Sequence, residues 1–434
     1  MIRNKKVVIL GGGLSGLSAA WHLQKKGIAC SLFEKENSTG GLCRSKQSNG
    51  FTFDSCGHLL HFKHRYAFGL VKRLLSGNLV EHKKSAWIFS HKTFTRYPFQ
   101  VNLYGLPQPV VKECLLEFIK ARFNGKNSFR NDPSFLDWIN QTLGKGIARH
   151  FMVPYNSKFW TIPPSKITCE WFDGFIPVPS LKEVIEGTIG TTNRIFGYNA
   201  RFWYPAKGGI GELTRAFSSG IKNISLGEEA QSIDLAGKTV HFSGGNSVKF
   251  DFLISTIPLP EFLRLAGRLP KKIASSLKQL KHNSIFNLNL GIDRQGLSGK
   301  HWVYFPEKKY PFFRAGFFSS FSRGLCPPGT SSLYIEASYS EDKPIDKDDI
   351  EQRLINGMFE CGILRPSDRI LAREVNDIKY GYIIYDRNRC SALKQIKGFL
   401  KEKGVFCLGR YGGWEYFSME DAILEGRKIC EVFI

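Results

Sequence analysis

The sequence has no long apolar run: no stretch reaches the roughly 18 uncharged residues that a membrane-spanning helix needs. It also has no hydrophobic segment of the kind that marks a secretory leader, because a short strand pattern begins soon after residue 1. These absences favour a soluble, cytoplasmic protein. Internal repeats are missing as well, so the 434 residues, 42% of them hydrophobic, are expected to fold into two or three packed lobes.

Paired cysteines are also absent. The ten cysteines occur singly, and none stands in a Cys-x-x-Cys pair or at a metal-type spacing from histidine. We therefore expect neither a disulfide framework nor a bound metal ion.

Acidic residues are scarce. Asp plus Glu number 38 against 61 Lys plus Arg, which gives a formal net charge of +23. A field of that sign attracts nucleotide diphosphates, nucleic acid or an anionic membrane face. The basic residues are spread along the chain without a nucleic-acid-binding motif, so no nucleic-acid partner is expected. Peripheral contact with an anionic membrane and a lysine-rich surface without a partner both stay open, and no pattern specifies an oligomeric state.

A glycine-rich turn joins the first predicted strand to the first predicted helix. Residues 7–10 are apolar, residues 11–16 read Gly-Gly-Gly-Leu-Ser-Gly, and helical periodicity follows. Gly11 permits the tight bend, Gly13 lets the backbone approach a pyrophosphate, and Gly16 lets helix and strand pack closely. A phosphate bound here would lie on the positive end of the helix.

The next strand completes the unit. Residues 29–33 form a second apolar run that ends at Glu34, where a carboxylate can accept hydrogen bonds from ribose hydroxyls. Strand, turn, helix and second strand fit within the roughly 30 residues of a dinucleotide-binding βαβ unit. The pattern therefore predicts a Rossmann-like fold that binds a dinucleotide.

The residues after Glu34 indicate which dinucleotide it is. Residues 39–45 read Thr-Gly-Gly-Leu-Cys-Arg-Ser. This resembles the Gly-Gly-x-x-Arg-Ser extension of the glutathione-reductase-like flavoproteins, in particular the amine oxidase, protoporphyrinogen oxidase and UDP-galactopyranose mutase group. The resemblance implies FAD as the cofactor, with Arg44 supplying a fixed cation to its pyrophosphate and two glycines letting the backbone pass close by.

The same resemblance implies an α/β fold class, with an FAD-binding Rossmann-like domain of the glutathione reductase type interrupted by inserted substrate domains. We expect a discontinuous FAD-binding domain over residues 1–65, 200–285 and 386–434. A mainly helical cap domain is expected over residues 66–199 and an antiparallel-sheet substrate domain over residues 286–385.

Segments farther along the chain resemble the UDP-galactopyranose mutases. Residues 53–58 (Phe-Asp-Ser-Cys-Gly-His) are similar to a loop that passes beside the flavin. Residues 97–100 (Tyr-Pro-Phe-Gln) and 155–160 (Tyr-Asn-Ser-Lys-Phe-Trp) are similar to segments of the nucleotide-sugar cleft. Residues 311–315 resemble the segment with a diphosphate-binding arginine, and residues 409–416 (Gly-Arg-Tyr-Gly-Gly-Trp-Glu-Tyr) the segment that meets FAD and substrate.

The resemblance implies a role for each matched residue. His58 becomes the candidate for contacting flavin N5, and Arg314 for holding a diphosphate with its planar fork. The residues implied to bind the cofactor are Gly11, Gly13, Leu14, Ser15, Gly16, Glu34, Lys35, Gly40, Gly41, Leu42, Arg44, Gly57, His58, Gly409, Arg410, Met419, Glu420 and Ala422. Those implied to bind substrate are Tyr97, Gln100, Tyr155, Asn156, Trp160, Phe175, Arg314, Tyr382, Tyr385 and Tyr416, and the catalytic set is His58, Arg314, Tyr382, Tyr385 and Tyr416.

Two departures from the family pattern bear on this site. Cys56 replaces a glycine, and Phe175 stands where related mutases carry an arginine. Loss of such a phosphate clamp removes a charge-assisted hydrogen bond unless Arg194, Arg201 or Lys207 takes its place. The expected substrate is therefore a nucleotide-diphosphate sugar or another small polar molecule, with no particular sugar or nucleotide implied.

The resemblance leaves more than one reaction class open. As a mutase, the protein would use reduced FAD, whose N5 attacks the anomeric carbon so that pyranose and furanose interconvert in glycan or envelope polysaccharide biosynthesis, with an unidentified electron donor. The alternative is an oxidoreductase of the amine oxidase or protoporphyrinogen oxidase type, which takes a hydride from its substrate; a flavin-binding module without catalysis is the third. Gln100, Asn156 and Arg314 favour the mutase, because an amine oxidase is expected to enclose its flavin in an apolar cage.

Overall fold

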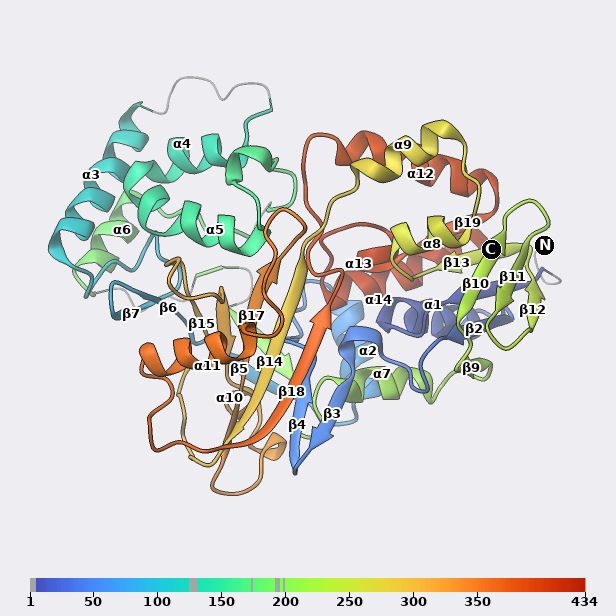
Figure 1. Ribbon diagram of the computed structural model, residues 1–434, viewed down its shortest axis with the longest axis horizontal. Coiled ribbons are helices and arrows are strands. Elements are labelled where there is room, and N and C mark those ends of the chain that lie inside the picture. Colours follow the sequence, from blue (N-terminus) through green and yellow to red (C-terminus); the bar gives the residue numbers. More distant parts are fainter. Residues whose placement is uncertain (1–4, 125–131, 173–174, 192–195, 198–199, 434) are drawn as a thin grey trace.

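The computed structural model describes residues 5–124, 132–172, 175–191, 196–197 and 200–433. A parallel sheet with the strand order β19-β13-β1-β2-β9 forms the base of the predicted dinucleotide domain (Figure 1). Its strands come from three distant parts of the chain. They are β1 (Val7–Leu10), β2 (Cys30–Glu34), β9 (Ile224–Leu226), β13 (Phe252–Ser255) and β19 (Val405–Cys407).

The first strand lies in the middle of this sheet. All of its side chains are buried, and β1 pairs in parallel with β2 on one side and β13 on the other. Two helices, α1 (Leu14–Lys25) and α14 (Met419–Lys428), pack together beside it, and Ser18 Oγ of α1 donates to the carbonyl oxygen of Ile423 at 2.8 Å. Gly426 permits this close approach, since a Cβ there would lie 2.4 Å from Ser18 Oγ. The two ends of the chain thus meet at the same sheet.

A second, mixed sheet has the strand order β18-β14-β17-β16-β15-β6-β7. Along strand β14, Phe286 and Leu288 pack into a separate hydrophobic core, whereas Asn287 and Asn289 hydrogen-bond to each other and to backbone on the opposite face. The strands are β6 (Ala86–Ser90), β7 (Thr93–Arg96), β14 (Ser284–Ile292), β15 (Trp302–Tyr304), β16 (Arg314–Gly316), β17 (Ser331–Tyr339) and β18 (Ile370–Ile378).

The interval expected to be mainly helical, residues 66–199, also supplies the hairpin β6–β7 to this sheet. Its turn is the dipeptide His91-Lys92, and both residues have positive φ angles, 52° and 59°. Two-residue hairpin turns of this kind usually carry Asn-Gly or a similar pair. Because that signal is missing here, the sequence did not indicate the hairpin.

Helices form the other part of the same interval. Ser134 begins α4 with a capping box, and α3 packs so closely on α4 that a Cβ at Gly146 would lie 2.7 Å from the Cα of Cys114. These helices are α3 (Gln108–Asn124), α4 (Phe135–Ile147), α5 (Val153–Trp160) and α6 (Leu181–Thr188).

The remaining elements connect or flank the two sheets, and the α/β fold class is confirmed. The limits of the three predicted domains stay a prediction. No helix among the described residues is long and apolar enough to cross a membrane. The other elements are β3 (Ser45–Ser48), β4 (Phe51–Asp54), α2 (Arg65–Leu74), β5 (Val80–Lys83), β8 (Arg201–Tyr204), α7 (Gly211–Ser218), β10 (Ala230–Asp234), β11 (Thr239–Phe242), β12 (Ser247–Lys249), α8 (Leu259–Leu265), α9 (Lys271–Gln279), α10 (Phe318–Phe321), α11 (Ile350–Glu360), α12 (Arg389–Glu402) and α13 (Gly409–Gly412).

Candidate functional site

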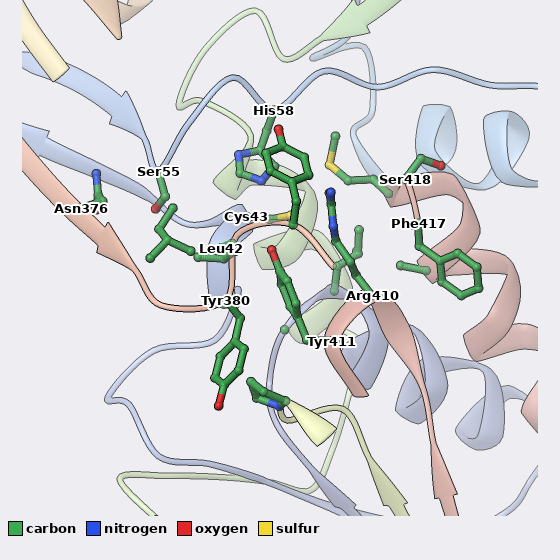
Figure 2. Close-up of a pocket in the computed structure, with 18 of the residues that line it drawn as sticks. Leu42, Cys43, Ser55, His58, Asn376, Tyr380, Arg410, Tyr411, Phe417 and Ser418 are labelled. Atoms are coloured by element: carbon green, nitrogen blue, oxygen red, sulfur yellow. The ribbon is translucent and has the colours of Figure 1, made fainter. Parts of the chain in front are cut away.

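A pocket of about 1110 Å³ runs from the turn after β1 to the tyrosines beside β15 and α14. Small-molecule pockets commonly hold ~300–1,000 Å³, so this one has room for a dinucleotide and a substrate together. Figure 2 shows part of it, with Arg410 pointing toward the region that His58 borders and Tyr380 on another wall.

At one end of the pocket the chain itself orients Glu34. The backbone N–H of Gly12 donates to Glu34 Oε2 at 2.6 Å, and the N–H of Glu36 donates to Oε1 at 3.0 Å. Each carboxylate oxygen retains a further lone pair for a ribose hydroxyl. Thr256, which the sequence did not indicate, anchors the turn by donating to the carbonyl oxygens of Leu10 and Gly11.

The two predicted glycine motifs lie against each other. The N–H of Gly40 donates to the carbonyl oxygen of Gly12 at 2.7 Å, and a Cβ at Gly41 would lie 3.1 Å from the Cα of Gly13. A Cβ at Gly16 would lie 2.0 Å from the carbonyl oxygen of Gly11, which explains the third glycine of the turn. Together these glycines form a backbone cradle, open at Gly13, that fits a pyrophosphate group.

Arg44 lies at the rim of this cradle. Its Nε donates to the carbonyl oxygen of Gly41 at 3.1 Å, and its Nη1 lies 3.8 Å from a carboxylate oxygen of Glu36. The side chain is 32% exposed, so the cation is fixed beside the glycine turn yet open to the pocket.

His58 borders the middle of the pocket. Burial lowers the pKa of its imidazole to about 4, so the ring is neutral at neutral pH. Its Nδ1 is buried and has no hydrogen-bond partner among the described residues. The neighbouring Gly57 has no room for a side chain, since a Cβ there would lie 2.1 Å from Tyr334 Oη.

Arg314 is held by a residue that the sequence did not single out. Its guanidinium binds both carboxylate oxygens of Glu336 on the adjacent strand β17, with 2.9 Å between Nη2 and Oε1. The Glu336 side chain is 2% exposed. Arg314 lines the pocket as expected, but a buried carboxylate already offsets its charge. The sequence offered one signal for Glu336, because an acidic residue is unusual within an apolar strand such as β17.

Arg410, in contrast to Arg314, has no carboxylate partner among the described residues. Its guanidinium lies 4.9 Å from the ring centre of Tyr382 and 5.0 Å from that of Tyr416. Nε and Nη2 are both buried without a hydrogen-bond partner among the described residues. Buried polar groups normally have partners, so these donors fit an acceptor on a bound molecule.

Tyr385 supports this region from behind, although it was expected to bind substrate. Its hydroxyl donates to Glu415 Oε2 at 2.9 Å and accepts from the backbone N–H of Tyr416 at 2.8 Å. Arg389 stacks on the Tyr385 ring and binds the same Glu415 carboxylate. Trp160 is likewise fully buried, 5.9 Å from the Tyr416 ring, so it packs behind the pocket wall.

The two buried amides of the substrate region have partners within the chain. Gln100 Nε2 donates to the carbonyl oxygen of Pro177 at 2.8 Å, and Asn156 Nδ2 donates to that of Met152 at 2.7 Å. Both residues line the pocket.

Phe175 lies beside them, edge-on to the Tyr416 ring at 5.7 Å. Of the cations that were expected to replace an arginine at this position, Arg201 pairs with Glu81 at 2.8 Å, Lys207 is not a lining residue, and Arg194 lies outside the described residues.

The pocket brings most of the predicted residues together. Glu420, which does not line it, accepts hydrogen bonds from the N–H groups of Lys63 and His64 and so ties α14 to the start of α2. Gly409 adopts φ of 78° beside Ser15. The predicted residues that line the pocket are Gly11, Gly13, Leu14, Ser15, Glu34, Lys35, Gly40, Gly41, Leu42, Arg44, Gly57, His58, Tyr97, Gln100, Tyr155, Asn156, Phe175, Arg314, Tyr382, Arg410, Tyr416, Met419 and Ala422, and those that do not are Gly16, Trp160, Tyr385, Gly409 and Glu420.

The chain is similar to known proteins. A family model described as "Flavin containing amine oxidoreductase" matches residues 14–432. The structure of a reduced UDP-galactopyranose mutase is similar over 99% of this chain and 96% of that chain, with 28% sequence identity and a TM-score of 0.93. A redesigned putrescine oxidase is similar over 99% of this chain and 98% of that chain at 14% identity and a TM-score of 0.68, which shows a shared fold alone.

A curated relative matches over a short segment only. The 4,4'-diaponeurosporene oxygenase of Staphylococcus haemolyticus (strain JCSC1435) is 46% identical over 50 residues, which span 12% of this chain and 10% of the relative.

Proposed function

Because the chain belongs to the family of flavin-containing amine oxidoreductases and its cofactor is FAD, we propose that it is a mutase that acts on a nucleotide-diphosphate sugar. The likeness to a UDP-galactopyranose mutase along nearly the whole chain supports this proposal. The fold is shared with enzymes of other activities, so the argument depends on the site.

The observation that carries the proposal is the unpartnered guanidinium of Arg410 between Tyr382 and Tyr416. A half-buried cation with two buried, free donors and neighbouring phenols suits a phosphate oxygen, because charge-assisted hydrogen bonds of planar guanidinium groups are strong. The family resemblance assigned Arg410 to the cofactor, whereas this proposal assigns its free donors to the diphosphate of the substrate. An amine or a hydrocarbon in that place would leave the donors unsatisfied, which costs roughly 1–3 kcal/mol for each buried group.

FAD, when bound and reduced, supplies a nucleophilic nitrogen for attack at the anomeric carbon of a sugar. The chain's own residues then have two tasks. Arg410, Tyr382 and Tyr416 hold the diphosphate so that it can leave and return, and the preorganised donors stabilise its developing charge. His58, kept neutral by burial, offers a hydrogen bond beside the sugar and adds no charge.

The second candidate is a net oxidoreductase. Phe175 and Trp171, which both contact the Tyr416 ring, place apolar surface on one wall of the pocket, and this suits a less polar substrate. A short segment matches an oxygenase, and the fold is shared with a putrescine oxidase. These two likenesses agree with an oxidoreductase but specify no substrate.

One experiment separates the two candidates. The holoenzyme is reduced with dithionite, incubated with UDP-galactopyranose and other nucleotide sugars, and the products are separated by chromatography. We expect a furanose isomer with reduced enzyme and none with oxidised enzyme. If no nucleotide sugar reacts, while an amine or a porphyrinogen bleaches the oxidised flavin without oxygen, the mutase proposal is wrong.

A further inference from the structure

Helices α9 and α12 lie side by side at one edge of the molecule (Figure 1). Ser276 Oγ of α9 donates to Gln395 Oε1 of α12 at 3.0 Å, and the apolar side chains of both helices, such as Ile273 and Ile396, are buried beneath them. The pair therefore presents one outer face to solvent, which we call the α9–α12 face.

The α9–α12 face is strongly basic. The sequence has no Asp or Glu from residue 262 to residue 292, and Glu402 is its one acidic residue from 387 to 404. Within the part of the chain that the structure describes, seven exposed cations on or next to the two helices have no carboxylate within 4.0 Å. They are Arg268, Lys271, Lys272, Lys278, Lys394, Lys401 and Lys403.

Other cations on or next to these helices have acidic partners. Lys397 Nζ is 3.4 Å from Glu415 Oε1, Lys281 Nζ is 3.7 Å from Asp386 Oδ2, and Arg389 binds Glu415. The seven outer cations line no part of the pocket, so the proposed reaction does not use them.

We propose that the α9–α12 face docks on an anionic lipid bilayer. Clusters of roughly four to eight Lys or Arg on an amphipathic helix are the pattern that binds anionic headgroups. The net charge of +23 adds a long-range attraction to the same partner. No exposed aromatic side chain stands on either helix, whereas nonspecific binding of single-stranded nucleic acid uses aromatic stacking as well as charge. This inference does not depend on which reaction the pocket performs.

The test is cosedimentation of FAD-loaded protein with lipid vesicles. Vesicles of phosphatidylcholine alone are compared with vesicles of phosphatidylcholine mixed with phosphatidylglycerol, at low and at high salt. We expect binding to the mixed vesicles at low salt and its loss at high salt, because salt screens exposed charges. Each basic residue near the surface contributes about fivefold, so the triple variant Lys271→Glu, Lys272→Glu, Lys278→Glu should lower partitioning at least ~100-fold.

A matched variant tests whether the face or the total charge matters. Arg65→Glu, Lys72→Glu, Arg73→Glu on α2 removes the same charge from another exposed stretch and should keep most of the binding. A second triple variant on α12, at Lys394, Lys401 and Lys403, should repeat the loss if the α9 variant misfolds; far-ultraviolet circular dichroism and flavin content report folding. Equal losses from α2 and α9, equal binding to neutral vesicles, or α9-dependent binding to DNA without binding to vesicles would each overturn the proposal.

Discussion

Arg314 and Glu336 form an ion pair whose removal should affect both stability and binding. Arg314→Ala leaves the carboxylate of Glu336, 2% exposed, without its partner, so the free energy of unfolding should fall by roughly 3–5 kcal/mol in urea titrations. If Arg314 also contacts the diphosphate, the affinity for UDP, followed through the flavin absorbance, should fall as well.

The pair Arg294–Asp368 supplies a matched control for this prediction. Its side chains are 20% and 3% exposed, its geometry is bidentate at 2.8 Å, and neither residue lines the pocket. Arg294→Ala should cost similar stability and leave the affinity for UDP unchanged. Equal affinities for UDP in both variants would show that Arg314 does not bind the diphosphate.

His58 should make stability depend on pH. Burial lowers its pKa in the folded protein to about 4, below the 6.5 of an exposed histidine. As the pH falls from 6.5 to 4, the unfolded chain gains a proton that the folded chain does not. The contribution of neutral His58 to the free energy of unfolding is therefore fully present above pH 6.5, and up to about 3 kcal/mol of it is lost by pH 4. The variant His58→Gln should make the curve of unfolding free energy against pH less steep between pH 6.5 and pH 4. Part of the slope should remain, because burial also lowers the pKa of His61 and of His301 to about 4. Identical curves for wild type and His58→Gln would contradict the assignment.

At the scale of elements, the loop between β18 and α12 positions Tyr416 through Tyr385. Tyr385→Phe removes the hydroxyl that accepts from the Tyr416 N–H and donates to Glu415. An unsatisfied buried N–H costs ~1–3 kcal/mol, so Tyr416 should shift and the affinity for UDP should fall about tenfold in a flavin absorbance titration. Tyr66→Phe, which loses a hydroxyl bonded to His22 away from the pocket, is the control. No difference between the two variants would show that Tyr385 does not position Tyr416.

The hairpin β6–β7 carries a turn whose residues do not suit its backbone. His91 and Lys92 both have positive φ, a conformation that costs roughly 1–2 kcal/mol for each L-residue with a side chain. An asparagine followed by a glycine adopts this turn more readily, so the double variant His91→Asn, Lys92→Gly should keep the fold and raise the urea midpoint by an amount worth about 1 kcal/mol. A lower midpoint would mean that His91 or Lys92 makes a compensating contact.

At the scale of the whole molecule, FAD should join parts of the chain that are far apart in sequence. Its predicted contacts come from the turn after β1, from residues 40–44 and from Gly409, which lies against Ser15 of that turn. A ligand that binds only the folded state stabilises it by ~2.7 kcal/mol at a hundredfold excess over its Kd. The Tm of the apoprotein should therefore rise with FAD concentration and rise less with riboflavin, which lacks the pyrophosphate. Equal effects of both would contradict a pyrophosphate site at the glycine cradle.

The sequence by itself determined the features whose physics is local. The turn at Gly11 to Gly16 has to bend, approach a phosphate and admit a helix within six residues, and each requirement selects glycine. Glu34 follows at the distance that a βαβ unit dictates, so the dinucleotide fold and its carboxylate were both predictable. The family resemblance then extended this prediction to FAD, and the match to flavin-containing amine oxidoreductases confirms it.

The tertiary structure decided what depends on residues far apart in the chain. That Glu336 neutralises Arg314 follows from the register of β16 against β17, and that Tyr385 lies behind Tyr416 follows from hydrogen bonds across 31 positions. Arg410 is left as a guanidinium with free donors for the same reason. Spacing along a sequence specifies neighbours within a turn, a strand or a helix, whereas the pairing of charges in a pocket depends on how sheets and loops pack, and that packing is set by the whole chain at once.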